Sequence, residues 1–285
     1  MKKILVTGAN SYIGRSFMAH VAQATDCIVD ELDVRDNQWL QADFSAYDTI
    51  FHVAGIAHFS KDESQKDLYY QVNTQLTADI AQKAKSDGVR QFIFMSSIIV
   101  YGDSTAQSRV ITPDTPLTPS DFYGDSKWQA EQALRALEDA SFLVTIIRPP
   151  MIYGKNSKGN YPRLANLAKK VPFFPNIRNE RSMLHVDNLC ELVYQVSIRQ
   201  LSGTFFPQNK EYVCTADLVQ SIARQHGKKV WLTGLFNPAI RLLFKFDVIK
   251  KMFGNLVYEK QMSQYAFDYQ LRTFEESIQL TEQAR

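Results

Sequence analysis

Tyr123 and Lys127 stand four residues apart in the segment FYGDSK, and on a helix this spacing places both side chains on one face. A free phenol has a pKa of about 10, which is too high for a base that works near neutrality. A neighbouring ammonium group favours the phenolate, so Lys127 is expected to lower the pKa of Tyr123. Ser97, in the segment MSSIIVYG, would hydrogen-bond the same substrate oxygen. The three residues therefore predict a catalytic site in which a proton and a hydride move at one alcohol carbon.

The pattern Tyr-x-x-x-Lys is also typical of ordinary surface helices, so it needs independent support. The start of the chain supplies it, because the apolar run Lys2–Thr7 leads directly into GANSYIG and then into apolar residues at helical spacing. A helix N-terminus after a small-residue turn binds a pyrophosphate through free N–H groups and the helix dipole. Gly8 would permit the turn and Gly14 the close packing of helix on strand. The same turn contributes the remaining predicted coenzyme contacts, Asn10, Ser11, Tyr12 and Ile13. Asn10 and Ser11 are also residue types that commonly form turns and helix caps.

Together these segments resemble the extended short-chain dehydrogenases/reductases, the NAD-dependent epimerase/dehydratase family of nucleotide-sugar enzymes. The family fingerprint TGxxGxxG is similar to TGANSYIG at residues 7–14, where Ser11 replaces a glycine. Further similar segments are HVAG at 52–55, RPPMIYG at 148–154 and RSMLHVD at 181–187. The resemblance implies an α/β fold with a Rossmann-type doubly wound parallel sheet that binds NAD or NADP. It also implies coenzyme contacts from Val53, Ala54, Gly55, Asn73 and Pro149.

Alternating apolar runs and helical patterns independently indicate a parallel sheet with helices on both faces. The expected strands are Ile4–Thr7, Cys27–Val34, Thr49–Val53, Gln91–Ser96 and Leu143–Arg148. The expected helices are Tyr12–Gln23, Tyr69–Ser86, Gly124–Glu138 and His185–Arg199. The resemblance divides the chain into an NAD(P)-binding Rossmann domain, residues 1–150 with 185–206 returning to it, and a smaller sugar-nucleotide-binding lobe, residues 151–184 and 207–285.

The adenosine end of the predicted coenzyme site is short. Only about 45 residues separate Gly8 from His52, an interval in which the family usually has two strands, and here Cys27–Val34 serves alone. A carboxylate at the end of that strand binds the ribose hydroxyls of NAD, whereas an arginine accepts the 2′-phosphate of NADP. Both kinds of side chain are present, so the coenzyme stays open, with NADP favoured by Arg35. The candidates are Asp30, Asp33, Val34 and Arg35.

Composition limits the other function classes. The 285 residues carry 32 Lys+Arg against 30 Asp+Glu, a net charge of +2, which points to no nucleic-acid partner. Three widely spaced cysteines without a CxxC pair predict reduced thiols in a cytoplasmic protein. No apolar stretch reaches the roughly 18 residues of a membrane span. His52 and His58 lack the further ligands that a metal site needs, so no metal is predicted.

Past residue 150 the sequence becomes rich in loops, prolines and aromatic residues. The resemblance assigns Arg181 to the substrate diphosphate, a role that suits the forked guanidinium donors. An ordinary ion pair with Glu180 or Asp187 is the alternative. Lys158 and Asn160 are further substrate candidates. Residues 237–253 predict one basic amphipathic helix that packs over the sugar site or on a partner subunit of a homodimer, with a membrane surface as the alternative.

The residues after Ser97 restrict the reaction. Sugar-nucleotide 4,6-dehydratases carry an acid and a base there, because eliminating water requires both; this chain has Ile98 and Ile99. Hydride chemistry at C4 of a UDP-hexose or UDP-N-acetylhexosamine remains. The resemblance to enzymes of capsule and O-antigen synthesis favours a 4-keto reductase, with a 4-epimerase that retains NAD as the alternative. A dinucleotide-binding protein without catalysis is a third reading, which the presence of Ser97, Tyr123 and Lys127 disfavours.

Overall fold

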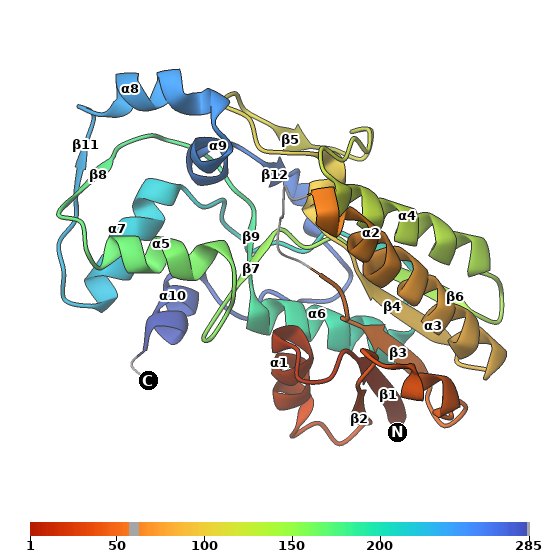
Figure 1. Ribbon diagram of the computed structural model, residues 1–285. Helices are drawn as coiled ribbons and strands as arrows, with labels where there is room; N and C mark the ends of the chain where they lie inside the picture. Colours follow the sequence, from red (N-terminus) through yellow and green to blue (C-terminus); the bar gives the residue numbers. More distant parts are fainter. Residues whose placement is uncertain (57–62, 284–285) are drawn as a thin grey trace.

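Six parallel strands form the central sheet of the computed structural model, which describes residues 1–56 and 63–283 (Figure 1). The order is β10-β6-β4-β3-β1-β2. The central strands are short apolar runs, as expected where helices cover both faces. The predicted Rossmann-type α/β fold is confirmed. The strands are β1 (Lys2–Thr7), β2 (Cys27–Leu32), β3 (Thr49–His52), β4 (Gln91–Met95), β6 (Leu143–Ile147) and β10 (Gly203–Phe205).

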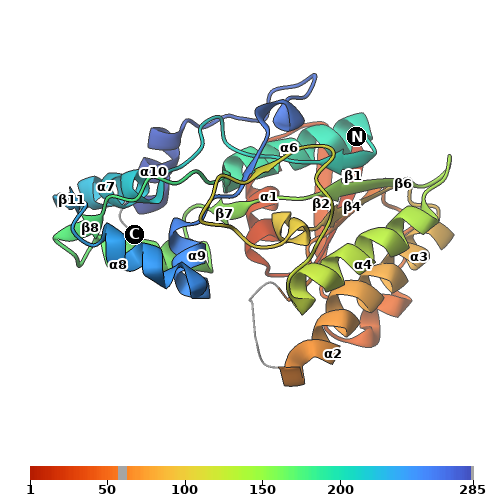
Figure 2. The same cartoon turned by 90° about the horizontal axis from the view of Figure 1, so that it is seen from above.

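Helices cover the sheet on both sides (Figure 2). On one face, Phe17 and Val21 of α1 share a buried core with α6. On the other face, α3 and α4 bury small and branched side chains such as Ile80 and Leu134. The predicted helix Tyr69–Ser86 begins earlier and is interrupted by the π-helical turn Tyr70–Gln75. The bounds are α1 (Tyr12–Val21), α2 (Lys66–Tyr69), α3 (Leu76–Ser86), α4 (Phe122–Leu137) and α6 (Val186–Arg199).

The sheet ends at β2. Between β2 and β3 the chain forms only the 3₁₀ turn Asn37–Gln41, which buries Trp39 against the sheet. The expectation of a single strand in this interval is confirmed. The predicted adenosine end of the coenzyme site therefore lies at an open sheet edge.

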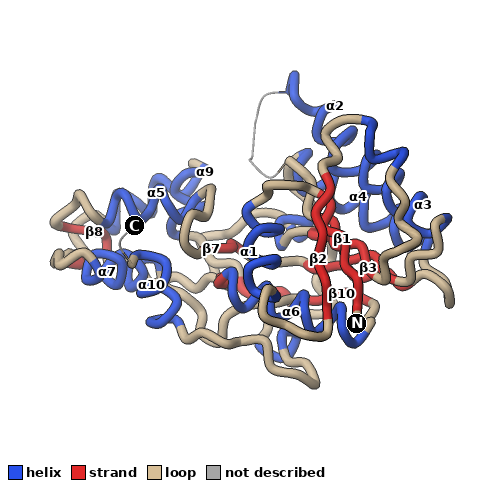
Figure 3. Tube along the Cα trace, turned by 90° about the horizontal axis from the view of Figure 1, so that it is seen from below, coloured by secondary structure: helices blue, strands red, loops and turns tan. Residues whose placement is uncertain are grey.

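A second core lies in the part of the chain after β6 (Figure 3), and short two-stranded pairs accompany the central sheet. Its helices bury one apolar face each, as in α7, where Leu218 and Ile222 are buried. The assignment of this core to the substrate and of the first core to the coenzyme stays a prediction. The strand pairs are β7 (Met151–Tyr153) with β9 (Met183–His185), β8 (Phe173–Pro175) with β11 (Trp231–Thr233), and β5 (Val110–Ile111) with β12 (Val257–Tyr258). The helices are α5 (Asn160–Ala168), α7 (Thr215–Gln225), α8 (Asn237–Leu242), α9 (Asp247–Phe253) and α10 (Phe274–Glu282).

The prediction of one helix over residues 237–253 is wrong. After α8 and the 3₁₀ turn Leu243–Lys245, Phe246 is extended, and α9 starts in a new direction. The break lets side chains from both sides of it pack on the second core: Ile240, Phe244, Ile249 and Met252. Within the described ranges we find no helix with the length and apolar character of a membrane span.

Candidate active site

Ser97 and Tyr123 meet at the carboxyl end of the sheet. Ser97 follows β4 and caps the 3₁₀ turn Ile98–Tyr101, while Tyr123 lies in the first turn of α4. That helix begins at Asp121, whose carboxylate accepts a 2.7 Å hydrogen bond from the Gly124 amide. Burial has the larger effect on the pKa of Tyr123 and raises it to about 12, whereas the neighbouring Ser97 hydroxyl lowers it. The phenol is therefore neutral at neutral pH.

Lys127 lies one turn beyond Tyr123, but its ammonium group points elsewhere. Its Nζ donates a 2.9 Å hydrogen bond to the carbonyl of Met95 and lies 4.7 Å from the centroid of the Phe94 ring. Burial lowers the pKa of Lys127 to about 8, because the charged form loses hydration. The prediction that Lys127 lowers the pKa of Tyr123 is wrong: Lys127 is not among the groups that shift it, and loss of hydration outweighs the favourable hydrogen bond.

Glu131 continues the same face of α4, one turn after Lys127, but its carboxylate is already occupied. It accepts from the Ser96 hydroxyl and from both sides of the Arg148 guanidinium, with 2.9 Å between Arg148 Nε and Glu131 Oε1. This pair is almost completely buried, and it holds α4 against the segment that carries Ser97. The sequence prediction does not include Glu131, although the four-residue spacing from Lys127 could have found it.

The turn after β1 has the backbone that a pyrophosphate site requires. Gly8 has a φ of +121°, and a Cβ atom there would lie 2.8 Å from the amide nitrogen of Ala54, so only glycine fits. Ser11 caps α1, and its hydroxyl accepts from the Gly14 amide at 3.1 Å. Asn10 donates its amide to the carboxylate of Glu31 at the end of β2. Of the other predicted contacts, Ile13 packs on the sheet core, and the Tyr12 hydroxyl is turned toward Gly154.

The loop after β3 lies beside the catalytic helix. Val53 and Ala54 both donate their amides to the carbonyl of Thr7, each at 3.0 Å. A Cβ atom at Gly55 would lie 3.0 Å from Lys127 Nζ, which puts this loop next to the lysine. Asn73 fixes the arrangement from the π-helical turn: its side chain accepts from the amide of Ile56 at 2.8 Å and donates to the Ser126 hydroxyl at 3.1 Å. The structure thus brings these predicted coenzyme residues next to α4, which carries the predicted catalytic residues Tyr123 and Lys127.

Two further predicted residues have structural contacts. The carbonyl of Pro149 accepts from the amide of Ile98 at 2.9 Å, which anchors the turn after Ser97. His52 is buried between the hydroxyls of Thr7 and Thr77, and burial lowers its pKa to about 3. His58 lies outside the described residues. Among residues 1–56 and 63–283, no group of three side chains is arranged to hold a metal ion.

At the end of β2 the candidate adenosine ligands bind one another. Arg35 donates to both carboxylate oxygens of Asp33, and this contact lowers the pKa of Asp33 to about 2. Both side chains are exposed, at 80% for Arg35 and 40% for Asp33. Asp30 is occupied elsewhere, by the Tyr47 hydroxyl at 3.0 Å. Val34 is buried in the sheet core.

Residues 4–203, more than half of the chain, match the family model described as "NAD dependent epimerase/dehydratase family". The chain belongs to this family. Similar proteins include a UDP-glucose 4-epimerase of Vibrio cholerae, 29% identical over 286 residues, which covers 90% of this chain and 86% of the relative. The N-acetyl-alpha-D-glucosaminyl-diphospho-ditrans,octacis-undecaprenol 4-epimerase of Escherichia coli O157:H7 is 32% identical over 235 residues, 78% of this chain and 68% of the relative. The fold is similar to that of a dTDP-4-dehydrorhamnose reductase from Clostridium acetobutylicum, with a TM-score of 0.75, 22% identity and 97% of each chain covered.

The residues that the family resemblance assigns to the substrate are not all together. Arg181 is partly buried, and its Nη1 donates to the carbonyls of Lys251 and Gly254 at the end of α9, at 2.9 and 3.4 Å. Burial lowers its pKa to about 10. No ion pair among the described residues involves Arg181, so the alternative of a pair with Glu180 or Asp187 is not observed. Lys158 and Asn160 are exposed at the start of α5, and no hydrogen bond between described residues joins either to Arg181.

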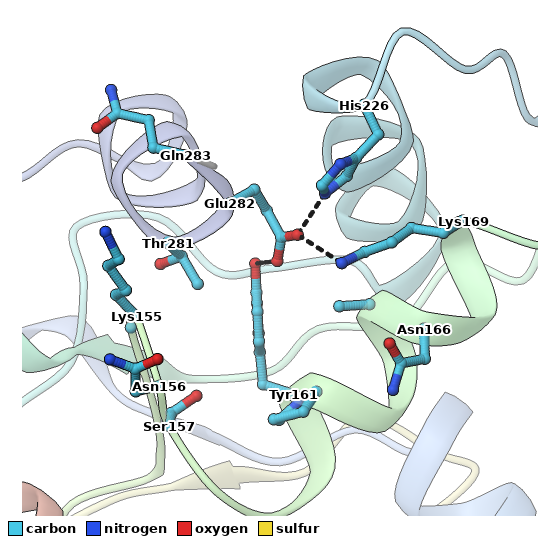
Figure 4. A pocket seen from close by; sticks show the side chains of 13 residues that line it. Lys155, Asn156, Ser157, Tyr161, Asn166, Lys169, His226, Thr281, Glu282 and Gln283 are labelled. Atoms are coloured by element: carbon cyan, nitrogen blue, oxygen red, sulfur yellow. Dashed lines mark hydrogen bonds and ion pairs between the residues drawn. The ribbon is translucent and has the colours of Figure 1, made fainter. Parts of the chain in front are cut away.

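Two cavities flank these elements. One, of about 430 Å³, lies between the loop after the Ser97 turn, residues 102–120, and the segment of Phe244 and Lys250. The other, of about 450 Å³, lies between α5, the end of α7 and α10 (Figure 4). There Glu282 accepts from Tyr161 and pairs with His226 and Lys169. None of the predicted site residues lines this second cavity.

Proposed function

We propose that this chain is a nicotinamide-dependent oxidoreductase that reduces a 4-keto sugar joined to a diphosphate, most simply a UDP-linked sugar used in surface polysaccharide synthesis. The observation that carries the proposal is the arrangement of Tyr123: its phenol contacts Ser97, while the Lys127 ammonium is turned to Met95. A reduction needs a proton donor at the new hydroxyl, and a neutral phenol is such a donor.

The proton follows a short path in this proposal. Ser97 hydrogen-bonds the carbonyl oxygen of the substrate and orients it toward the Tyr123 phenol. Tyr123 then donates its proton as that oxygen gains charge. The reduced nicotinamide, when bound, supplies the hydride. Lys127, held beside Gly55 and Met95, would bind the nicotinamide ribose and restore the proton on Tyr123 afterwards.

Two observations support reduction over related reactions. Ile98 and Ile99, which begin the turn after Ser97, have no ionisable group, so an elimination of water lacks its acid and base. The sheet ends at β2, and the exposed pair Asp33–Arg35 lies at its edge. An open adenosine site suits a coenzyme that must leave after every turnover.

A 4-epimerase is the second candidate, and the two relatives described above, both named as 4-epimerases, favour it. An epimerase first removes the proton of a 4-hydroxyl, and it must retain its reduced coenzyme until the hydride returns. A phenol with a raised pKa is a poor starting base for that first step. One relative is named for a sugar on undecaprenol diphosphate. The diphosphate is therefore the part that nucleotide-linked and lipid-linked substrates share, and we assign it to Arg181.

For the coenzyme we propose NAD, although Arg35 alone favours NADP in the sequence. Asp33 directly follows Leu32, whose carbonyl accepts the amides of Gly8 and Ala9 in the turn. This position places an ionised carboxylate where the adenosine ribose is expected, and Glu31 adds a second one next to Asn10. Two carboxylates favour ribose hydroxyls and repel a 2′-phosphate.

The test offers UDP-glucose, UDP-N-acetylglucosamine and their 4-keto-6-deoxy derivatives, each with and without NADH or NADPH. A reductase consumes reduced coenzyme in step with the 4-keto sugar. Tyr123→Phe is expected to lower this turnover at least about a hundredfold, with coenzyme affinity nearly unchanged. The control Tyr194→Phe removes a phenol hydroxyl that donates to Asp26 on the surface. Epimerisation without added reductant would establish the second candidate, and full activity of Tyr123→Phe would exclude this catalytic assignment.

A further inference from the structure

Exposed apolar side chains concentrate in one segment of the chain. Of the fourteen large hydrophobic side chains that are exposed among the described residues, six fall within residues 235–248. Leu242 is 80% exposed, Val248 69% and Phe246 52%. We call this set, with the basic residues between them, the α8–α9 surface: Leu235, Phe236, Arg241, Leu242, Leu243, Lys245, Phe246 and Val248.

Packing of the second core does not account for these side chains. The segment already contributes Ile240, Phe244 and Ile249 to that core from its inner side. Its outer side is apolar as well, which is unusual for a surface helix of a globular protein. In Figure 1, α8 runs along the margin of the molecule next to β8 and β11. Phe173 and Trp231, register partners in those two strands, are also exposed.

The charge around this surface has one sign. Residues 218–258 contain seven Lys or Arg and one acidic residue, Asp247, a formal charge of +6. The whole chain carries only +2, so the remainder is net acidic at −4. Arg241 and Lys245 lie within the apolar set and are exposed. Lys245 stacks on Phe246 and Lys229 on Trp231, with 5.3 and 3.8 Å between Nζ and the ring centroid.

An anionic lipid bilayer matches this combination better than a second copy of the chain. Aromatic and leucine side chains enter the region between headgroups and acyl chains, while Lys and Arg pair with lipid phosphates. In a two-fold dimer the same patch meets itself, so Arg241 and Lys245 would face the partner's like charges. Asp247, the one acidic residue in this stretch, does not balance the seven basic residues of residues 218–258, so that contact is unfavourable.

The surface is joined to the candidate substrate site. The last carbonyls of α9 hold Arg181, and Phe244 and Lys250 line the cavity beside the loop that follows Ser97. A bilayer on the outer side of α8 and α9 would therefore lie close to Arg181, the residue to which we assign the substrate diphosphate.

We propose that the α8–α9 surface docks this protein on a bilayer that contains anionic lipids. The apolar side chains enter the interface, and the basic side chains select the anionic headgroups. Docking is a property of the folded chain and requires neither coenzyme nor sugar. It is thus tested apart from the reaction proposed above.

The experiment is co-sedimentation of the full chain with phosphatidylcholine vesicles, with and without phosphatidylglycerol. We expect binding to the anionic vesicles alone, and weaker binding as ionic strength rises. The double variant Arg241→Gln/Lys245→Gln should bind about twenty-five-fold more weakly, because each basic side chain near an anionic surface contributes about fivefold. Leu242→Ser/Phe246→Ser should weaken binding at least about tenfold.

Matched controls distinguish binding through the α8–α9 surface from non-specific binding to vesicles. Ile28→Ser/Leu40→Ser changes exposed apolar residues at the sheet edge, and Lys66→Gln/Arg90→Gln removes two exposed charges elsewhere. Both should bind vesicles like the wild type. The proposal is overturned if the wild type does not bind, binds neutral vesicles equally well, or loses no more affinity in the surface variants than in the controls. A dimer in sedimentation velocity that Leu242→Ser/Phe246→Ser dissociates would instead assign the surface to a second copy.

Discussion

Arg148 and Arg181 are both withdrawn from solvent, but only Arg148 has a carboxylate partner. Arg148 forms a two-point contact with Glu131 and donates to the Tyr101 hydroxyl at 2.7 Å. Among the described residues, the Arg181 guanidinium donates to the backbone carbonyls of Lys251 and Gly254 at the end of α9 and to no carboxylate. A buried cation that is fully paired belongs to the fold, whereas one without an acid keeps its capacity for an external anion. The comparison separates a structural arginine from a candidate ligand-binding one within a single chain.

Lys127 belongs with Arg181 in this comparison. The acidic residue one turn further along α4, Glu131, is already bound to Arg148 and Ser96, and the Lys127 ammonium donates to the carbonyl of Met95. The Arg148–Glu131 ion pair thus has a second effect besides stabilising the fold. It keeps a carboxylate from neutralising the lysine at the predicted catalytic site.

The largest effect is expected for Arg148→Met. This change leaves the buried Glu131 carboxylate with the Ser96 hydroxyl but without its cationic partner, and it should lower the free energy of unfolding by about 3–5 kcal/mol. Urea denaturation measures it. Arg178→Met is the matched control, because Arg178 makes the same two-point contact with Asp217 on the surface, where such pairs contribute no more than about 1 kcal/mol. If Arg148→Met and Arg178→Met lowered the free energy of unfolding equally, the buried pair would contribute no more to the fold than a surface pair.

Lys127→Met should separate activity from stability. Turnover is expected to fall at least about a hundredfold, with weaker coenzyme binding, since the ammonium group is lost. Stability should rise at pH 7 by about 1–3 kcal/mol, because the pKa of Lys127 is about 8 in the folded chain instead of 10.5. The unfolded chain holds the proton of Lys127 more tightly than the folded chain does. The loss of folding stability caused by the buried ammonium is therefore complete below pH 8, and it disappears as the pH rises to 10.5.

Urea denaturation of Lys127→Met and wild type near neutral pH and again between the two pKa values measures this difference. Lys83→Met is the control, since Lys83 is paired with Asp87 at 2.8 Å and its removal should give no gain at either pH. A loss of stability in Lys127→Met that does not depend on pH would show that Lys127 is a packing residue.

The fold was predictable because its signal is local. The apolar runs of β1, β3, β4 and β6 alternate with helical patterns, and the structure shortens most of them by only one or two residues. The strand β10 was not predicted, since three residues beginning with Gly203 carry too little pattern. Periodicity also could not detect the extended Phe246, because the apolar spacing continues on both sides of it.

For the candidate site, the sequence predicts which side chains lie near one another but not which groups they bind. Motif spacing brings Ser97 and Tyr123 together, and the contact is present. The direction of the Lys127 ammonium depends on Glu131 and Arg148, which lie far apart in the sequence and pair only in the folded chain. Likewise, Arg35 and Asp33 appear as competing ligands in the sequence, but the structure shows that they bind each other.

Arg181→Met should change binding far more than stability. The carbonyls that Arg181 satisfies lie at a helix end, so the free energy of unfolding is expected to change by no more than about 1 kcal/mol. If Arg181 binds the diphosphate, the Kd of the sugar substrate should rise at least about tenfold, the scale of one charge-assisted contact. Isothermal titration with a UDP-sugar measures this, and Arg181→Lys should recover part of the affinity. If Arg181→Met bound the UDP-sugar normally but was less stable, Arg181 would be a structural arginine like Arg148.

The smallest effect is expected for Arg35→Ala, which removes a cation that is paired but exposed. Surface pairs contribute little to stability, so the denaturation midpoint should not move. NAD affinity should stay within about twofold, because the ribose is met by Asp33, whose carboxylate the change sets free. Asp33→Asn is the companion variant and should weaken NAD several-fold. If the wild type instead binds NADP more tightly than NAD and Arg35→Ala loses that preference, Arg35 is a phosphate ligand. The coenzyme phosphate would then displace Asp33 from Arg35. In that case, the presence of a carboxylate partner would separate structural from ligand-binding cations only in the interior of this protein.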